Sequence, residues 1–419
     1  MEQTLSIIIF LIVIVAIISE KIHRTAAALA GTVMLMLTHI LNVERAIHYI
    51  DFNTIGVLLG MMIFVSIVKR SGLFEYVAIK SAKMAHGDPW RIMVAFMFLT
   101  AILSAFLDNV TTVLLIGPMT ITICQMLKIN PVPMLLTQIF ASNIGGTATL
   151  IGDPPNIMIG SAAGLDFLDF MMNTGVIVVI IMILLVFIMK FVYGKAMKAD
   201  MTAISDIMKL DENKAISDFV LLKKSLVMMV FVVAGFVLHG QLNVESSVVA
   251  LTAAVVMLII GKQNNEHIIM ETEWTTILFF IGLFVVVGGM VETGVIQHFA
   301  DILVSVTKGN QILTMMVLLW GAAILSSILD NIPFVATLIP LIMAMGQSGV
   351  NIEPFWWAIS LGACLGGNGT LIGASANVVL TGISNKHGHP ISFKEYTKVG
   401  FPVMLFSVAV ATVYLLVRY

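Results

Sequence analysis

The sequence predicts an all-α polytopic membrane protein built from two inverted repeats. The chain has 419 residues, of which 59% are hydrophobic and 11% are charged, and its mean hydropathy is +1.03. Charged residues make up about a quarter of an ordinary globular protein, so one water-soluble core cannot hide this much apolar sequence. Long apolar runs recur along the whole chain, and an unusual polar motif occurs twice inside them. These observations indicate membrane helices and an internal duplication.

The duplication is clearest around two Asp-Asn pairs. The segment SAFLDNVTTVLLIGPMTITICQ contains Asp108, and it returns without gaps as SSILDNIPFVATLIPLIMAMGQ around Asp330. After a one-residue deletion, ASNIGGTATLIGDPPN is matched by ACLGGNGTLIGASAN. Matching positions also occur upstream of these motifs, where Asp51 corresponds to Glu273 in the same register. Each repeat therefore covers nearly half of the chain.

The apolar runs give the elements in chain order. A membrane of ~30 Å requires about 20 helical residues, and about 10 spans are expected in total. The runs lie at 4–20, 25–42, 52–69, 92–107, 110–127, 133–163, 171–194, 223–240, 247–261, 272–292, 310–329, 332–347, 355–384 and 399–417.

Two kinds of run depart from simple spans. The short pairs on either side of the Asp-Asn motifs predict re-entrant helical hairpins at 90–128 and 310–347. The runs 133–163 and 355–384 are long and interrupted by Gly, Thr, Pro and Asn, which predicts helices broken in mid-membrane. Each repeat then has five transmembrane helices, one of them broken, and one hairpin. Because five is odd, the second copy is inverted relative to the first.

The positive charges test this topology, since cytoplasmic loops collect Lys and Arg. With both termini outside, 19 of the 22 lysines and arginines fall on the cytoplasmic side, leaving Arg45, Lys308 and Arg418 outside. The first apolar run lacks a positive leader and a cleavage motif, so we expect a retained span. The predicted organisation is a first repeat at 1–194, a cytoplasmic linker at 195–222 and a second repeat at 223–419.

Enzymatic chemistry has no support in the sequence. The hydrophilic linker has room for one amphipathic helix but not for a catalytic domain. Cys124 and Cys364 lie in apolar runs and form no CxxC site. No metal motif, phosphate-binding motif or nucleophile-base pair occurs among the spans, so we expect no enzyme activity and no cofactor other than a bound sodium ion.

Asp108 and Asp330 are the most unusual residues, because an aspartate at the membrane centre costs ~3 kcal/mol and is functional unless it has a structural partner. No segment assigned to mid-membrane holds a Lys or Arg to neutralise them. Each aspartate either binds a proton or cation, or caps the helix that follows. Asp153 has no acidic counterpart, and it precedes two prolines. It is equally compatible with a helix cap and with a ligand role.

The broken helices supply further candidate ligands, because irregular backbone is tolerated at membrane depth only where it lines a cavity or is buried in protein. Interrupted segments in corresponding places of two inverted halves are the best sequence indication of a transporter's binding site. The alternative is that these polar groups only satisfy freed backbone or bind between helices. The candidate ion- or substrate-binding residues are Asp108, Asn109, Thr111, Asn143, Gly145, Gly146, Thr147, Asp153, Asn156, Asp330, Asn331, Gly366, Gly367, Asn368, Thr370 and Asn377, with a possible sodium site at Asp108, Asn109, Asp330 and Asn331.

These motifs carry a family resemblance. LDNVTTVLL with NIGGTATLIGDPPN, and LDNIPFVATLIP with ACLGGNGTLIGASANVV, resemble the P protein (pink-eyed dilution) branch of the ion transporter superfamily. That superfamily also contains arsenite permeases, sodium/proton antiporters and sodium-coupled dicarboxylate and citrate carriers. The resemblance implies a homodimer whose hairpins and broken helices move like an elevator against a scaffold. Sodium-coupled relatives carry Ser-Asn-Thr at the hairpin tips, whereas this chain has Asp-Asn-Val and Asp-Asn-Ile.

Together, these observations predict a secondary active transporter of an inorganic ion or small anion, coupled to protons or sodium. Two alternatives remain open: a sodium-coupled dicarboxylate or citrate symporter, and a passive anion channel. The expected partners are the small ion or anion, protons or sodium, the lipid bilayer and a second copy of the chain, with no nucleic acid. We expect a bacterial or archaeal cell membrane.

Overall fold

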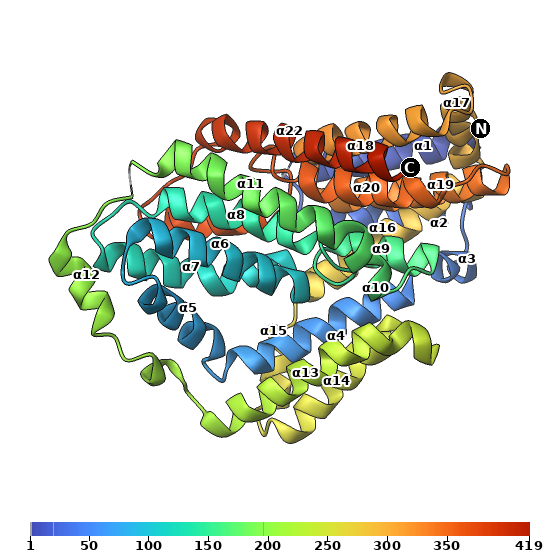
Figure 1. Cartoon of the computed structure of the whole chain (residues 1–419). Helices are drawn as coiled ribbons and strands as arrows, with labels where there is room; N and C mark the ends of the chain where they lie inside the picture. Colours follow the sequence, from blue (N-terminus) through green and yellow to red (C-terminus); the bar gives the residue numbers. More distant parts are fainter. Residues whose placement is uncertain (1, 20, 196) are drawn as a thin grey trace.

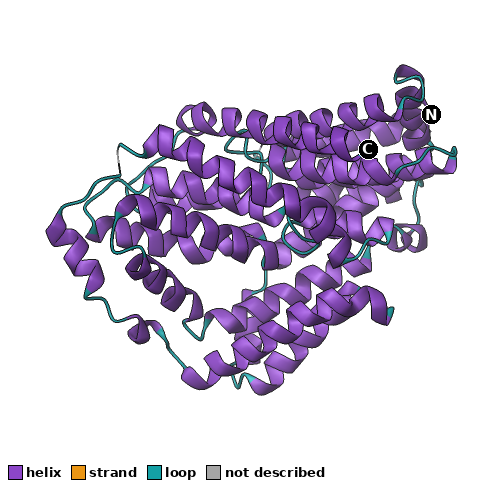
Figure 2. Ribbon diagram, in the orientation of Figure 1, coloured by secondary structure: helices purple, strands orange, loops and turns teal. Residues whose placement is uncertain are grey.

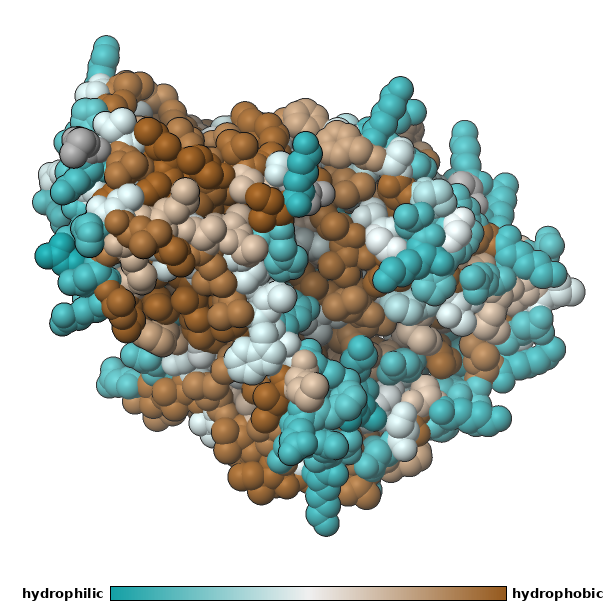
Figure 3. All heavy atoms as spheres, turned by 180° about the vertical axis from the view of Figure 1, so that it is seen from behind, coloured by the Kyte–Doolittle hydropathy of each residue, from teal (hydrophilic) through white to brown (hydrophobic). Residues whose placement is uncertain are grey.

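The computed structural model describes residues 2–19, 21–195 and 197–419, and all its regular elements are helical (Figures 1 and 2). Nine helices in this part of the chain are long and apolar enough to cross a membrane. Apolar side chains cover the broad middle of the face seen in Figure 3, and hydrophilic side chains gather mainly at its two ends. This distribution is that of a protein surrounded by lipid.

The order of helices repeats. The first series is α1 (Glu2–Ser19), α2 (Arg24–Leu37), α3 (Val43–His48), α4 (Phe52–Lys69), α5 (Leu73–Met84), α6 (Pro89–Phe106), α7 (Asn109–Met126), α8 (Val132–Gly146), α9 (Pro154–Ala163), α10 (Phe167–Phe170), the π-helical turn η1 (Met171–Gly175) and α11 (Val176–Tyr193). The second is α13 (Phe219–Leu242), α14 (Ser246–Ile260), α15 (Asn265–Glu271), α16 (Trp274–Glu292), α17 (Val295–Val306), α18 (Gln311–Ile328), α19 (Asn331–Gln347), α20 (Glu353–Gly366), α21 (Ser375–Lys386) and α22 (Phe393–Arg418). Each helix of the first series has its counterpart in the second, with α22 matching α10–α11.

The linker is short and docked. It contains α12 (Met201–Met208) and the 3₁₀ turn η2 (Glu212–Ala215), and α13 begins at Phe219, within the segment predicted as linker. Lys83 of α5 donates to the carbonyl of Leu210 at 2.9 Å and also pairs with Glu212. The linker is therefore held against the first repeat.

Two helical hairpins approach each other from opposite ends of the molecule. The α6–α7 hairpin comes from the end near α12, and the α18–α19 hairpin comes from the end near α3 and α17 (Figure 1). Each second arm contains a proline, Pro118 in α7 and Pro340 in α19. Both hairpin predictions are confirmed, as are the two interrupted helices, which appear as α8–α9 and α20–α21.

The helices pack as two bundles. In the hairpin bundle, α6 packs on α8, α18 packs on α20, α7 packs on α21 and α9 packs on α19. In the scaffold bundle, which comprises α1–α4 and α13–α16, α2 packs on α16 and α4 packs on α14. The main contacts of the scaffold bundle therefore join one repeat to the other.

The sequence prediction missed four short helices: α3, α5, α15 and α17. They are too short or too polar to meet the length criterion for a span. In α17, apolar Val295, Ile296 and Ala300 are buried while polar neighbours are exposed, which is the pattern of a helix lying along a surface.

Candidate functional site

The hairpin turns place both aspartates at helix N-termini. The Asp108 carboxylate accepts the Thr111 backbone N–H at 2.9 Å and also accepts the Thr111 hydroxyl. The Asp330 carboxylate accepts the backbone N–H of Ile332 at 3.3 Å. Capping by aspartate stabilises a helix start by about 1 kcal/mol. Both aspartates therefore cap the helix that follows, and in each of them the second carboxylate oxygen accepts from a further group, the Thr111 hydroxyl for Asp108 and Arg24 and Ser375 for Asp330.

Both hairpin tips reach one small cavity at the middle of the bundle. This central chamber has a volume of about 30 Å³ and is lined by Arg24, Leu58, Met62, Asp108, Asn109, Val110, Asp153, Pro154, Glu273, Thr276, Asn331, Ile332 and Ser375. One water molecule needs roughly 10–15 Å³ of such space. The chamber therefore has room for a small ion, and it is formed by residues from both repeats.

Asp153 faces the second hairpin. It is 1% exposed and stands at the N-cap position of α9, yet its side chain makes no capping hydrogen bond. The Nδ2 of Asn331 instead lies 3.4 and 3.3 Å from its two carboxylate oxygens. The interpretation of Asp153 as a helix cap is therefore wrong, because its carboxylate contacts the tip of the opposite hairpin.

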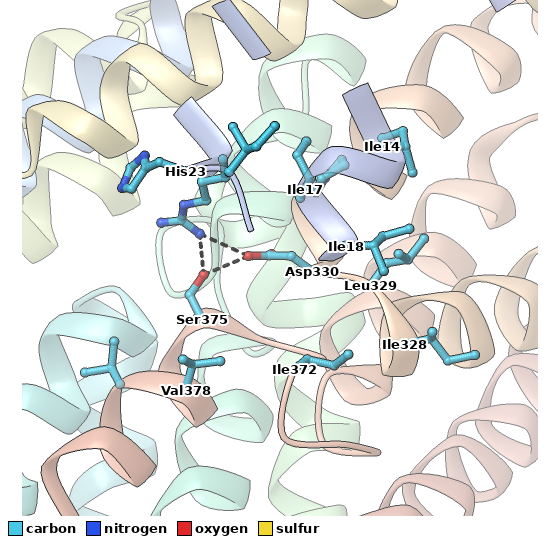
Figure 4. Close-up of a pocket in the computed structure, with 14 residues that line it drawn as sticks. Ile14, Ile17, Ile18, His23, Ile328, Leu329, Asp330, Ile372, Ser375 and Val378 are labelled. Carbon is cyan, nitrogen blue, oxygen red and sulfur yellow. Dashed lines mark hydrogen bonds and ion pairs between the residues drawn. The ribbon is translucent and has the colours of Figure 1, made fainter. Parts of the chain in front are cut away.

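Arg24 corrects the expectation that no cation reaches the aspartates. It is the first residue of α2, and its guanidinium Nη1 lies 3.1 Å from the Asp330 carboxylate and 2.7 Å from the Ser375 hydroxyl. The Ser375 hydroxyl donates to the same carboxylate at 2.7 Å (Figure 4). Asp330 lines a neighbouring cavity of about 320 Å³ that shares Arg24 and Ser375 with the chamber.

The four residues of the predicted sodium site are therefore divided. Asp108, Asn109 and Asn331 line the chamber, whereas Asp330 lies in the adjoining cavity and is paired with Arg24. Within the described residues, no cluster of three or more His, Cys, Asp or Glu side chains could hold a metal ion. A cation in the chamber would have to be held by carboxylate, amide and carbonyl oxygens.

A buried network of amides lies behind the chamber. Asn143 donates through Nδ2 to the side-chain oxygens of Asn368 and Asn377, both at 3.0 Å, and accepts from Asn109 at 3.5 Å. Asn143, Asn368 and Asn377 are fully buried. This network joins the first hairpin tip to the broken helices of both repeats, so it couples their positions.

Two asparagines satisfy the open backbone where the helices break. Asn156 donates to the carbonyls of Gly146, Thr147 and Thr149, and Asn377 donates to those of Gly367 and Thr370. The hydroxyls of Thr149 and Thr370 donate to Ala105 and Ser327 in the hairpins, and that of Thr147 donates to Asn143 one turn earlier. For this group, the structural alternative raised by the sequence accounts for every contact made.

The glycines of the broken helices permit close approach to the hairpins. A Cβ at Gly145 would lie 2.3 Å from the Ala101 carbonyl oxygen, and one at Gly366 would lie 2.6 Å from that of Ala323. A Cβ at Gly146 would lie 2.7 Å from the Gly152 carbonyl oxygen, whereas one at Gly367 would lie 3.1 Å from the Ala374 Cβ. Gly145, Gly146 and Gly366 therefore need glycine for space, and Gly367 is closely packed.

A wider cavity leads towards the chamber from the end where α5 and the linker lie. It measures about 600 Å³, and Lys69, Arg70, Glu75 and Ser217 line its outer part. It shares Met62 and Glu273 with the chamber, and Thr111 also lines it. This cavity approaches the tip of the first hairpin.

Sequence reasoning missed Arg24, Glu273 and Thr276 as members of the site and left Ser375 out of the candidates. The sequence pattern places Arg24 in a cytoplasmic loop, because it follows a lysine between two apolar runs. Glu273 could have been identified from the sequence, since it is an acidic residue at the start of a span and occupies a position matched by Asp51 in the other repeat. Thr276 carried the same repeat signal, because it matches Thr54 in the first repeat, and Ser375 lies among the polar residues of the second broken helix.

Comparison with known proteins agrees with this architecture. The family described as "Citrate transporter" (CitMHS) matches residues 14–362. An uncharacterized transporter of Mycobacterium bovis is 42% identical over 100% of this chain and 99% of its own length. The human P protein is 32% identical over 96% of this chain, which spans 58% of that longer protein, so the resemblance seen in the motifs is confirmed.

A solved structure shares the fold. The YdaH transporter of Alcanivorax borkumensis, described as having an unusual topology, superimposes with a TM-score of 0.56 at 15% identity, covering 88% of this chain and 86% of that one. The family match extends over most of the sequence, and the mycobacterial relative matches from end to end. The chain is a membrane transporter and belongs to the CitMHS citrate transporter family.

Proposed function

We propose that this protein is a secondary active transporter that moves a small inorganic ion or small anion in exchange for, or together with, protons or sodium. The observation that carries the proposal is the central chamber, where hairpin tips from two inverted halves meet. Asp108, Asp153 and Glu273 face it, opposed by the single guanidinium of Arg24. An excess of carboxylates in a partly enclosed cavity within the membrane attracts a cation or protons.

Asp108 is the best placed coupling residue. Its carboxylate lines the chamber, and no Lys, Arg or His side chain in the described ranges lies within 4.0 Å of it. The side chains of Asn109 and Asn331 line the same cavity and offer amide oxygens. We propose that these groups hold the coupling ion while the transported species enters beside them.

The packing supports an elevator movement. The hairpin bundle carries both tips and both broken helices, and the two cavities that adjoin the chamber lie between this bundle and the scaffold bundle or linker. Movement of the hairpin bundle would carry Asp108, Asp153 and Asn331 across the membrane, away from the scaffold residues that complete the chamber in this state. We propose further, from family resemblance, that two copies associate through the scaffold and that both termini lie outside a bacterial or archaeal membrane.

A second candidate is a symporter of citrate or a dicarboxylate. It is favoured by the matching family's description and by Arg24, whose guanidinium suits a carboxylate ligand. The chamber's other charges oppose a free polyanion, so this substrate would require cations to bind first. Sodium-dependent thermal stabilisation by citrate or succinate would favour this candidate.

The test begins with a stabilisation screen of purified protein against sodium, pH, arsenite, phosphate, citrate and succinate. Ligands that raise the melting temperature are then measured for coupled flux in proteoliposomes. Asp108→Asn should abolish coupling while preserving the helix cap, because Asn caps as well as Asp. Asp88→Asn is the matched control, since Asp88 caps α6 through the Arg91 N–H but does not line the chamber.

Coupled flux at the wild-type rate in Asp108→Asn would refute the role of this carboxylate. Flux that never saturates and appears as single-channel current would instead show a passive channel.

A further inference from the structure

The two hairpin tips have the same sequence motif but different electrostatic surroundings. Asp330 has Arg24 at 3.1 Å, whereas Asp108 accepts hydrogen bonds from the N–H and hydroxyl of Thr111. Duplication predicts two equivalent tips. The difference must therefore come from a residue that one repeat has and the other lacks.

That residue is Arg24. In the register that aligns Asp108 with Asp330, its counterpart in the second repeat is Ser246, whose hydroxyl contacts Asn53 at 3.4 Å. Ser246 has no charge to offer Asp108. The repeats therefore place a fixed positive charge beside one aspartate and none beside the other.

Several contacts hold Arg24 in place. Nη1 contacts Asp330 and Ser375, Nη2 donates to Thr276 at 3.3 Å, and the guanidinium carbon lies 5.1 Å from the centre of the Phe279 ring. The Arg24 side chain is 29% exposed and that of Asp330 is 15% exposed. A guanidinium stays protonated at every physiological pH, so the charge at this tip is permanent.

From this asymmetry we infer that Arg24 is a built-in counterion that takes the place of an exchangeable cation at Asp330, so that the chain binds a single coupling cation, at Asp108. A monovalent cation approaching the Asp330 carboxylate would be repelled by the guanidinium already there. It would also have to displace the hydrogen bonds from Arg24 and Ser375. The Asp108 carboxylate also accepts a hydroxyl hydrogen bond, from Thr111, but it has no guanidinium within 4.0 Å to repel the cation.

The inference rests on the proposed function, because it assigns the coupling ion of that same transporter. It specifies the number of coupling cations, one per chain, and the location of their site, at the tip of the first hairpin. It also assigns Arg24 a role in specificity, since removing the guanidinium should create a second cation site from the residues already present.

The experiment counts bound cations on the purified full-length protein. Equilibrium binding of radioactive sodium at pH 8.5 should give one site per chain for wild type and two for Arg24→Gln. Arg24→Lys should keep one site, because it retains the charge. The double variant Arg24→Gln/Asp330→Asn should return to one site, which separates the effect from misfolding of the single variant.

Arg45→Gln is the matched control. Arg45 pairs with Glu292 and lines neither the chamber nor the adjoining cavity, so its removal should leave the count at one. If wild type binds no sodium, the same counts are made for protons by potentiometric titration against Asp108→Asn. The acidic groups at or beside the chamber in that titration are Asp108, Asp153, Glu273 and Asp330.

Two sites in wild type, or one site in Arg24→Gln, would overturn the inference. Neither result touches the proposed function if saturable coupled flux persists in liposomes. Absence of both sodium and proton binding in every variant, together with no saturable flux, would overturn both.

Discussion

Substituting alanine for the glycines where broken helix and hairpin touch should destabilise the fold in both repeats, and more strongly in the first. In Gly145→Ala the new Cβ would lie 2.3 Å from the Ala101 carbonyl oxygen, and in Gly366→Ala it would lie 2.6 Å from that of Ala323. Ordinary van der Waals contact begins at 3.4 Å. The obstructing atoms belong to helix backbone and cannot rotate away, so the helices must separate by about 1 Å in the first repeat and slightly less in the second.

The magnitude follows from two opposing terms. Over-packing of this kind costs about 1–3 kcal/mol, whereas exchanging glycine for alanine inside a helix gains up to about 1 kcal/mol. The net expectation is a loss of roughly 1–2 kcal/mol, larger for Gly145→Ala. Gly321→Ala in α18 is the matched control, because nothing lies within 4 Å of its added Cβ.

The assay is thermal unfolding of each variant in the same detergent. Gly321→Ala should unfold at or above the wild-type temperature, Gly366→Ala below it and Gly145→Ala lowest. Equal stability of Gly145→Ala and Gly321→Ala would refute the reasoning, because it would mean that α8 and α6 do not approach as closely as described.

Three further predictions concern buried polar groups and the linker. Asn377→Ala should lower the unfolding free energy by about 2 kcal/mol, because two backbone carbonyls lose their donor, whereas exposed Asn385→Ala should leave the melting temperature unchanged. Asn143→Ala should lower the unfolding free energy by a similar amount. The double variant with Asn377→Ala should lose clearly less than the sum of the two single losses, since the two amides share a hydrogen bond. Additive losses in thermal unfolding would show that the network is not coupled. The hydrogen bond from Lys83 lowers the pKa of Glu212 below its usual 4.5, so this contact supports the docked linker above that pH and is lost as the pH falls through the lowered value. The hydrogen-exchange protection factors of residues 197–215 should fall on acidification in wild type and already be low at neutral pH in Lys83→Met. Identical protection in the two proteins at neutral pH would contradict this account.

The sequence predicted the repeat and its hairpins well because the duplication supplied two independent observations of each element. A single Asp-Asn pair in an apolar run is compatible with several structures. The same pair at the matching position of the second repeat identifies the hairpin turn in both copies. The breaks in 133–163 and 355–384 were predictable for the same reason, since glycines recur at matching positions of the two runs.

The missed features depend on contacts between residues distant in sequence. Arg24 follows the rule that assigns basic loop residues to the cytoplasm, and only the packing of α2 against α16 brings its guanidinium to Asp330, 306 residues away. Asp153 precedes a helix and has the composition of a cap, yet the second hairpin supplies a partner that no local pattern could reveal. Local rules identify candidate residues, whereas the pairing among them is set by tertiary packing.

In the scaffold bundle, helices of one repeat pack on helices of the other: α2 lies on α16, and α4 lies on α14. This packing constrains the order in which the chain can assemble. As the ribosome delivers the first half, α2 and α4 enter the lipid without the neighbours that will cover them, and they must wait until the second half is synthesised. The scaffold can therefore be completed only after α16, which ends at Glu292, has been made. By the same geometry, an ancestral half-length protein would have covered its scaffold helices only as an antiparallel dimer, in which the helices of each subunit pack on those of the other.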